Sequence, residues 1–285
     1  MQPFSAKRAR FLHVVVGGLL LVGISVGGGG CNSPAPASGT YASFGTLDTI
    51  ATTEASRDSV LAVLARMDRA AFDSAFAKLP AYAMTRHVRT EQLDTTGATT
   101  AYRTLTLRYP SGSQSGTVQR ADSGGSFRAG GMLSGITPAQ QRTERPANLA
   151  AQTLPDDPAY LAPRTQEAYR YALRRDSLLD GTPVFVVEAK ARSDERGADQ
   201  DIRYARLTID RASHALVGLA TTRSSRILLF REHSQIAIRL RRASRNLGSE
   251  TWVPRLTRFR AVVDVPFRTP RQFRTVSAYY AYEHR

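Results

Sequence analysis

Residues 169–191 read YRYALRRDSLLDGTPVFVVEAKA, and this stretch decides the fold. Tyr169, Tyr171 and Leu173 alternate with other residues on the first arm, and residues 184–191 form the second arm, which begins with the apolar run 184–187. Asp180 and Gly181 lie between the arms, and this pair is typical of tight turns between antiparallel strands. The stretch therefore predicts a β-hairpin.

The same period of two continues on both sides of the hairpin. Upstream, it predicts strands at residues 103–109 and 117–120. Downstream, it predicts strands at residues 202–210, 215–222, 227–232, 235–241, 251–259, 260–267 and 273–282. Short strands joined by tight turns favour a mainly β (α+β) fold, in which a curved antiparallel meander forms an incomplete barrel.

One helix is predicted before the strands, over residues 53–79. Val60, Leu64, Met67 and Ala71 recur at helical spacing, and Pro80 ends the pattern. Residues 123–148 are rich in Gly, Ser, Pro and Gln, and they indicate a long loop with a short strand at Phe127. We expect the apolar stripe of the helix to face the core of the sheet.

The N-terminal segment has the pattern of an export signal. Lys7, Arg8 and Arg10 precede an apolar run over residues 11–26, four glycines follow, and Cys31 is the single cysteine. The segment resembles a bacterial lipoprotein signal, although Gly28 stands where that family usually has Leu. The resemblance implies cleavage before Cys31 and attachment of lipid, such as palmitate, to its thiol. Because Asn32 follows, it also implies the outer membrane, facing the periplasm, with the leaflet left open.

These patterns divide the chain into three parts. Residues 1–30 are the expected signal peptide, and residues 31–50 carry the lipid and form a flexible tether rich in Ser, Pro, Ala and Gly. Residues 51–285 form one half-barrel domain. With one cysteine the domain has no internal disulfide, so its apolar core must stabilise it.

The second half of the chain resembles the lipoprotein-sorting superfamily of LolA and LolB. The residues that carry the resemblance are GTPVFVVE at 181–188, ARLTID at 205–210, ALV at 215–217 and WVP at 252–254. The family has an incomplete β-barrel, and the resemblance implies that the chain handles lipids or lipoproteins without catalysis. The expected lipid on Cys31 implies a membrane as one partner, and either an apolar ligand or an envelope protein is expected as the second.

Two groups of residues are candidate contacts. If an apolar ligand enters the half-barrel, its predicted lining is Val184, Val186, Glu188, Leu207 and Ile209. Contacts to an anionic group, such as a lipid phosphate, are predicted at Arg239, Arg241, Arg258 and Arg260. A surface ion pair between Glu188 and Lys190, and a solvated outer face for the arginines, are the alternatives.

Composition and motifs exclude several classes of function. Lys and Arg outnumber Asp and Glu by 39 to 24, a net charge of +15, but export removes nucleic acid as a partner. The segment nearest to a nucleophile elbow, residues 112–116, has Gln114 in place of the nucleophile. No phosphate-binding loop is present, and the histidines lack metal-ligand spacing. We therefore expect no enzyme, no cofactor and no metal.

Two functions remain open. In the first, the half-barrel is hollow and binds an acyl chain or a lipoprotein, with the helix as a possible lid. In the second, the chain is a structural or interaction lipoprotein with a packed core, and it binds an envelope protein.

Overall fold

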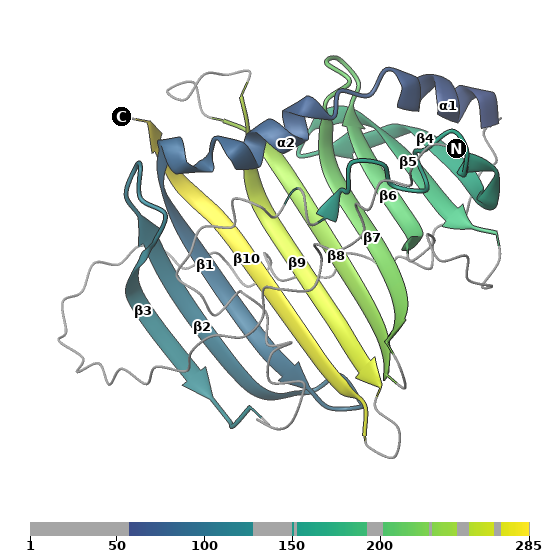
Figure 1. Ribbon diagram of the computed structural model, residues 1–285. Helices are drawn as coiled ribbons and strands as arrows, with labels where there is room; N and C mark the ends of the chain where they lie inside the picture. The colour runs from purple at the N-terminus through teal and green to yellow at the C-terminus, as the bar shows by residue number, and fades with distance from the viewer. Residues whose placement is uncertain are drawn as a thin grey trace, which may run out of the picture.

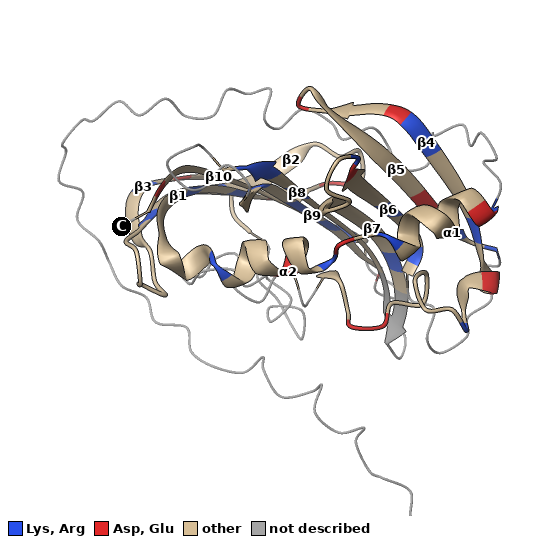
Figure 2. Ribbon diagram, turned by 90° about the horizontal axis from the view of Figure 1, so that it is seen from above, with Lys and Arg blue, Asp and Glu red and all other residues tan. Residues whose placement is uncertain are grey.

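A computed structural model describes residues 57–127, 150, 153–192, 202–227, 230–243, 251–264 and 269–284. The signal, Cys31, the tether and most of the loop predicted above lie outside these residues, so they stay predictions. The described residues form one curved, unclosed antiparallel sheet of ten strands with two α-helices on one of its faces (Figures 1 and 2). The predicted fold class, a mainly β meander that does not close into a barrel, is confirmed.

The order of the strands across the sheet is β3-β2-β1-β10-β9-β8-β7-β6-β5-β4. The first three are β1 (Tyr82–Leu93), β2 (Thr99–Tyr109) and β3 (Thr117–Gly124). The other seven form an unbroken meander: β4 (Tyr169–Leu179), β5 (Thr182–Ala191), β6 (Ile202–Asp210), β7 (Leu216–Ile227), β8 (Phe230–Arg242), β9 (Trp252–Asp264) and β10 (Arg271–His284). Pairing of β1 with β10 joins the two meanders into one sheet.

The predicted hairpin is confirmed as β4 and β5. Its turn has positive φ at both central residues, 51° at Asp180 and 82° at Gly181. Asp and Gly tolerate this conformation, and it matches the twist of the flanking strands. The next turn is also tight, because Asp210 Oδ2 accepts hydrogen bonds from Ser213 N and Oγ.

Several predicted boundaries are wrong. Residues 227–232 do not form a separate strand, because β7 runs to Ile227 and β8 begins at Phe230. Residues 252–264 form the single strand β9 instead of parts of two. Phe127 lies outside any strand. β1 was not predicted at all, although it is an interior strand that pairs with both β2 and β10.

The single predicted helix is two helices, α1 (Arg57–Ala65) and α2 (Ala70–Ala77). The chain breaks between them because Asp68 forms a parallel bridge to Ala215. The Asp68 carboxylate also accepts hydrogen bonds from Ala70 N at 2.9 Å and Ala71 N at 3.4 Å. An acceptor at this position satisfies the free N–H groups of the first turn and begins a new helix. A short 3₁₀ helix, η2 (Leu79–Ala81), follows α2.

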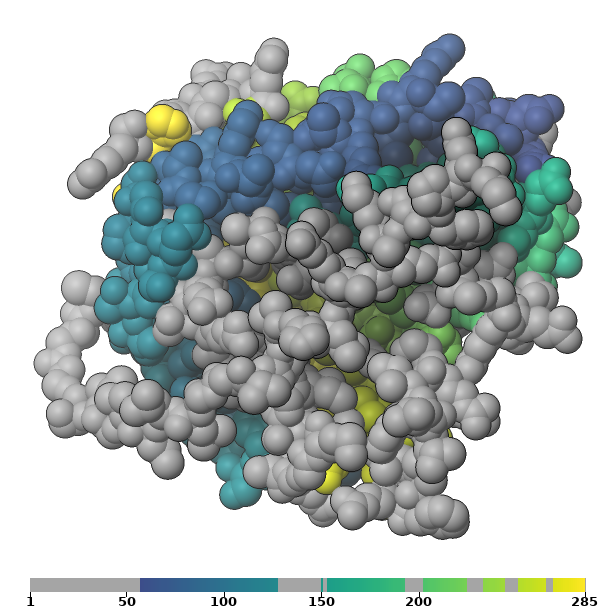
Figure 3. Space-filling view, in the orientation of Figure 1, coloured from purple at the N-terminus to yellow at the C-terminus, as the bar shows by residue number. Residues whose placement is uncertain are grey.

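The core lies between the helices and the sheet. We call the face that carries Val187, Leu207 and Ile238 the helix face, and the opposite face the outer face. Phe72, Phe76 and Leu79 from the helical segment are fully buried in the same core cluster as these strand residues. Figure 3 shows the helical segment along the upper rim of this face, with atoms of the C-terminal strands below it.

Candidate functional site

The helix face carries continuous rows of directly paired residues across the sheet. One row joins Leu173, Val187, Leu207, Leu219 and Ile238 through four strand pairs. Their side chains are at most 5 % exposed. The described helices and strands therefore fill this part of the half-barrel themselves.

The five predicted cavity residues do not share one face. Leu207 and Ile209 lie on the helix face and are fully buried. Val186 pairs with Thr208 and Glu188 pairs with Arg206, so Val184, Val186 and Glu188 have the opposite parity and belong to the outer face. The register thus separates the five residues by parity, while Val184 is buried in the same core cluster as Leu207 and Ile209. A role in ligand contact stays a prediction for all five. The alternation of side chains in the sequence separates the two faces of each strand. Only the register between paired strands shows which of these faces form one surface.

Glu188 forms its ion pair with a residue other than Lys190, the partner named in the ion-pair alternative. Its side chain is 4 % exposed, and Arg206 Nε donates to Glu188 Oε1 at 3.2 Å. Lys190 is exposed. The buried carboxylate is therefore paired across strands β5 and β6 instead of along β5.

The helix face also carries an apolar patch that the sequence does not predict. Ile236 pairs directly with Phe259, and Phe273, which pairs with Ala261, lies one diagonal step away on β10. All three side chains are half-buried, unlike the fully buried row above them. We call Ile236, Phe259 and Phe273 the apolar patch. Its residues come from three adjacent strands, so only the register could have revealed it.

Polar side chains lie next to this patch. Thr221 on β7 pairs directly with Ile236, and Arg223 follows two residues later on the same face. Thr221 Oγ1 and Arg223 Nε are buried without a hydrogen-bond partner. The hydroxyl of Tyr160, a fully buried residue, also lacks one. Burial raises the pKa of Tyr160, while the charges of Arg223 and Arg69 act to lower it.

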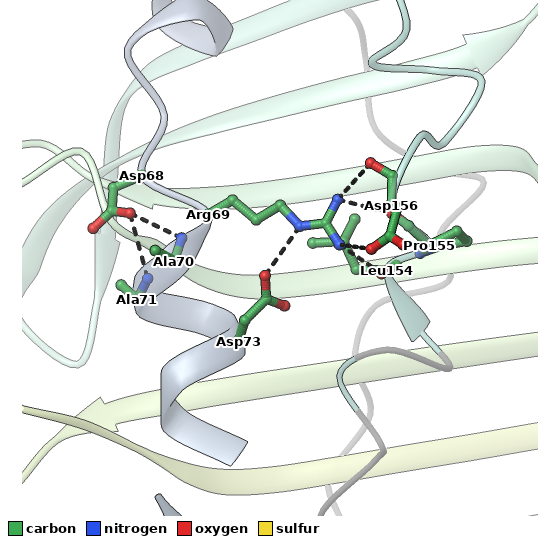
Figure 4. Close-up of polar contacts among 8 residues, drawn as sticks. All are labelled: Asp68, Arg69, Ala70, Ala71, Asp73, Leu154, Pro155 and Asp156. Carbon is green, nitrogen blue, oxygen red and sulfur yellow. Dashed lines mark hydrogen bonds and ion pairs between the residues drawn. The ribbon is translucent and has the colours of Figure 1, made fainter. Parts of the chain in front are cut away.

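The segment that carries Tyr160 is attached to the start of α2 (Figure 4). The Arg69 guanidinium donates to Leu154 O at 2.9 Å, Pro155 O at 2.8 Å and Asp156 O at 3.0 Å. Its Nε donates to Asp73 Oδ2 at 3.2 Å. On the other side, the Tyr171 hydroxyl donates to Tyr160 O at 2.8 Å. Residues 154–160 are therefore held between α2 and β4.

The predicted anion contacts lie on the outer face. Arg258 pairs with Ala237, and Arg239 and Arg260 have the same parity on β8 and β9. Burial lowers the pKa of Arg239 and Arg258, and neighbouring arginines lower it further. Arg241 lies over the ring of Tyr282, with Cζ 5.6 Å from its centroid. Arg260 donates to Gln272 Oε1 at 3.1 Å. Arg241 lies two residues after Arg239 on β8 and has the same parity, so the register brings all four to the outer face.

Two cavities that are lined by described residues do not include the apolar patch in their lining. The larger, about 580 Å³, lies beside the β4–β5 turn and is lined by Gly181, Thr182, Pro183, Asp210, Arg211, Ala212 and Arg242. Arg242 donates to the buried Asp210 carboxylate there, at 3.2 Å. The smaller, about 320 Å³, is lined by Ala83, Arg108, Pro110, Ser111, Glu283 and His284.

Neither a metal cluster nor a membrane-spanning helix is found in the part of the chain that the structure describes. Within these residues, no three His, Cys, Asp or Glu side chains are grouped to hold a metal ion. Of the described helices, none has the length and hydropathy needed to cross a bilayer.

No protein-family model matches the chain, and no curated protein matches it. Among solved structures, it is similar to an outer membrane lipoprotein-sorting protein domain from Vibrio parahaemolyticus, with 13 % identity and a TM-score of 0.29 over 80 % of this chain and 93 % of that one. A DUF1329 family protein from Desulfovibrio piger has 10 % identity and a TM-score of 0.28, over 80 % and 92 %. A LolA superfamily protein from Nitrosomonas europaea has 11 % identity and a TM-score of 0.24, over 81 % and 94 %.

Proposed function

We propose that the protein is a non-enzymatic lipoprotein of the cell envelope that binds the apolar chain of a lipid or lipoprotein on the helix face of its sheet. The observation that carries this proposal is the apolar patch. Ile236, Phe259 and Phe273 are large side chains on adjacent strands, and all three are only half-buried. A chain lying across them would remove their remaining apolar surface from water, which favours binding by about 25 cal/mol per Å² before the costs of association.

The shape of the sheet supports the same function. The sheet is unclosed, and α1 and α2 lie along the upper part of the helix face (Figure 1). The fully buried core beneath α2 ends near Ile238, and the patch begins one row further along the strands. A ligand on the patch would therefore extend the existing core instead of displacing it.

The proposed location depends on the N-terminal segment. A lipid on Cys31 would hold the domain at a membrane, and residues 32–50 would act as its tether. We propose the outer membrane, with the domain facing the periplasm. Anchoring is tested by Cys31→Ser, which should move the protein from the membrane fraction to the soluble fraction. Retention of this variant by membranes after signal removal would contradict lipid anchoring.

Ligand binding is tested on the full chain, purified without added lipid, by mass spectrometry of an organic extract. Phe259→Asp should remove co-purifying acyl species, because it introduces a charge into the patch. The matched control is Val262→Asp on the same strand, since Val262 is also half-buried but belongs to the outer face. It should leave the acyl content unchanged. Equal acyl content in all three proteins would contradict a site on the patch.

The second candidate, a scaffold that binds an envelope protein, is favoured by the packed core. Leu207, Ile209 and Phe76 are all fully buried within the protein itself. In this case the extract of the wild-type protein would contain no acyl species above that of an unrelated control protein. Added lipids would not bind to it either.

A further inference from the structure

We propose that Tyr160, Thr221 and Arg223 form a site for an anionic oxygen-bearing head group, a carboxylate or a phosphate, at one end of the apolar patch. The inference rests on the proposed function, because it assigns the chemical class of the ligand that the patch would bind. None of these three residues was a candidate from the sequence.

The first argument is hydrogen bonding. The hydroxyls of Tyr160 and Thr221 belong to fully buried residues, and neither has a partner among the described residues. Arg223 Nε is also buried and also has no hydrogen-bond partner among the described residues. A buried donor without a partner costs free energy, so groups of this kind are rare in folded proteins. Arg223 is near enough to act on the Tyr160 hydroxyl, and Thr221 lies two residues before Arg223 on the same face of β7. We therefore infer that an acceptor belongs among these three groups.

The second argument is charge. Within the described residues, no carboxylate forms an ion pair with Arg223. The positive charges of Arg223 and Arg69 both act on the Tyr160 hydroxyl. Arg69 already donates to three carbonyl oxygens and Asp73, so Arg223 is the cation with capacity left for a ligand. A half-buried guanidinium favours an anion with two oxygens, which it can bind in a bidentate manner.

The third argument is position. Thr221 pairs directly with Ile236, the first residue of the apolar patch, and Ile236 pairs with Phe259. Strands in a sheet lie about 4.8 Å apart, so the three steps from β7 to β10 span about 14 Å. A polar end followed by an apolar surface of this length is the arrangement that an amphiphile with one acyl chain requires.

The test compares ligands with the same chain and different heads. Decanoate, decyl phosphate and decanol are titrated into the full chain by calorimetry, and inorganic phosphate is titrated separately. We expect decanoate and decyl phosphate to bind about tenfold more tightly than decanol, a typical effect of a charge-assisted contact. Arg223→Gln should abolish this preference and leave the affinity for decanol within about twofold.

The two hydroxyls provide a second readout that does not depend on the guanidinium. Tyr160→Phe and Thr221→Val should weaken decanoate binding and leave the Tm of the ligand-free protein unchanged or raised, because each removes a donor that has no partner. Thr222→Val is the matched control, since Thr222 is the neighbouring residue of opposite parity on β7. It should leave decanoate affinity unchanged. A clear fall in Tm for Tyr160→Phe would show that the hydroxyl is already satisfied and would overturn the site.

The outcomes separate this inference from the proposed function. Equal binding of decanol and decanoate would support the apolar patch and overturn the head-group site, as would a preference that survives Arg223→Gln. If none of the three amphiphiles binds, the proposed function fails. In that case, phosphate binding that Arg223→Gln abolishes would support a site for a free anion, and its absence would overturn the site as well.

Discussion

Glu188 on β5 lies directly opposite Arg206 on β6, and the guanidinium donates to the carboxylate at 3.2 Å. The carboxylate is 4 % exposed and the guanidinium side chain 23 %, so the pair is largely withdrawn from water on the face that carries no helix. Such a pair need not stabilise the fold relative to an apolar pair of the same size. Removing one partner, however, leaves the charge of the other partner without an opposite charge beside it.

Glu188→Ala is therefore expected to lower the free energy of unfolding by about 2–4 kcal/mol, measured by urea denaturation. The control is Asp157→Ala, which breaks the exposed ion pair with Arg164, whose side chain is 80 % exposed. This change should cost less than about 1 kcal/mol. Similar losses in the two variants would show that Glu188 is no more dependent on its partner than a surface carboxylate.

The Glu91 carboxylate makes the stability of the fold depend on pH in the acid range. Burial acts to raise the pKa of Glu91, but hydrogen bonds from Arg89 and Arg274 outweigh it and the pKa is lowered. A lowered pKa means that the folded state holds the proton less tightly than the unfolded state. The stabilisation is therefore complete above the unfolded pKa of about 4.5 and is lost as pH falls through the folded value.

We expect the free energy of unfolding to fall as pH decreases below about 4.5, and Glu91→Gln to make this fall shallower. Denaturation at a series of pH values measures both. Glu283→Gln is the matched control, because Glu283 pairs with Arg108 but its side chain is 65 % exposed. If the Glu91 and Glu283 variants have the same pH profile as the wild type, the two arginines do not stabilise the Glu91 carboxylate.

Asp68 determines where the helical segment breaks. Its carboxylate accepts from the N–H groups of Ala70 and Ala71, while its backbone pairs with β7. Asp68→Ala removes the side-chain acceptor and leaves the backbone bridge, so it should cost about 1 kcal/mol, as loss of a helix cap does. Asp68→Asn should retain most of the stability. A fully stable alanine variant would show that the bridge to Ala215 alone sets the break.

The hairpin and the later strands could be predicted because their sequence alternates cleanly between apolar and polar residues. β1 could not, because it carries charges on both faces. Arg86 is 4 % exposed and donates to Ser277 Oγ, while Glu91 on the opposite face binds Arg274. These partners are more than 180 residues away along the chain. Local periodicity contains no information about them.

The residues of the candidate site also could be predicted only in part from the sequence. The sequence predicts one surface for Leu207, Ile209, Val186 and Glu188. In the structure Leu207 and Ile209 lie on the helix face, and Val186 and Glu188 belong to the outer face. Sequence alternation gives the two faces of a strand without saying which face of its neighbour is continuous with each. The apolar patch and the site around Tyr160 depend wholly on such relations. The break at Asp68 was missed because the apolar spacing of Val60, Leu64 and Met67 continues past it.

Arg69 links the helical segment to the loop that carries Tyr160. Three carbonyl oxygens of residues 154–156 accept from its guanidinium, and a lysine ammonium at the same place could not present its donors in a fixed plane to all of them. Arg69→Lys and Arg69→Gln should therefore both release this loop, the second more fully. Hydrogen exchange should accelerate at residues 154–162, while amides of β8 and β9 keep their protection. Arg164→Gln, which affects only an exposed pair at the end of the same loop, is the control and should change neither region. Unchanged exchange at residues 154–162 in both Arg69 variants would show that the loop is held by Tyr171 and its own packing, and that α2 does not position Tyr160.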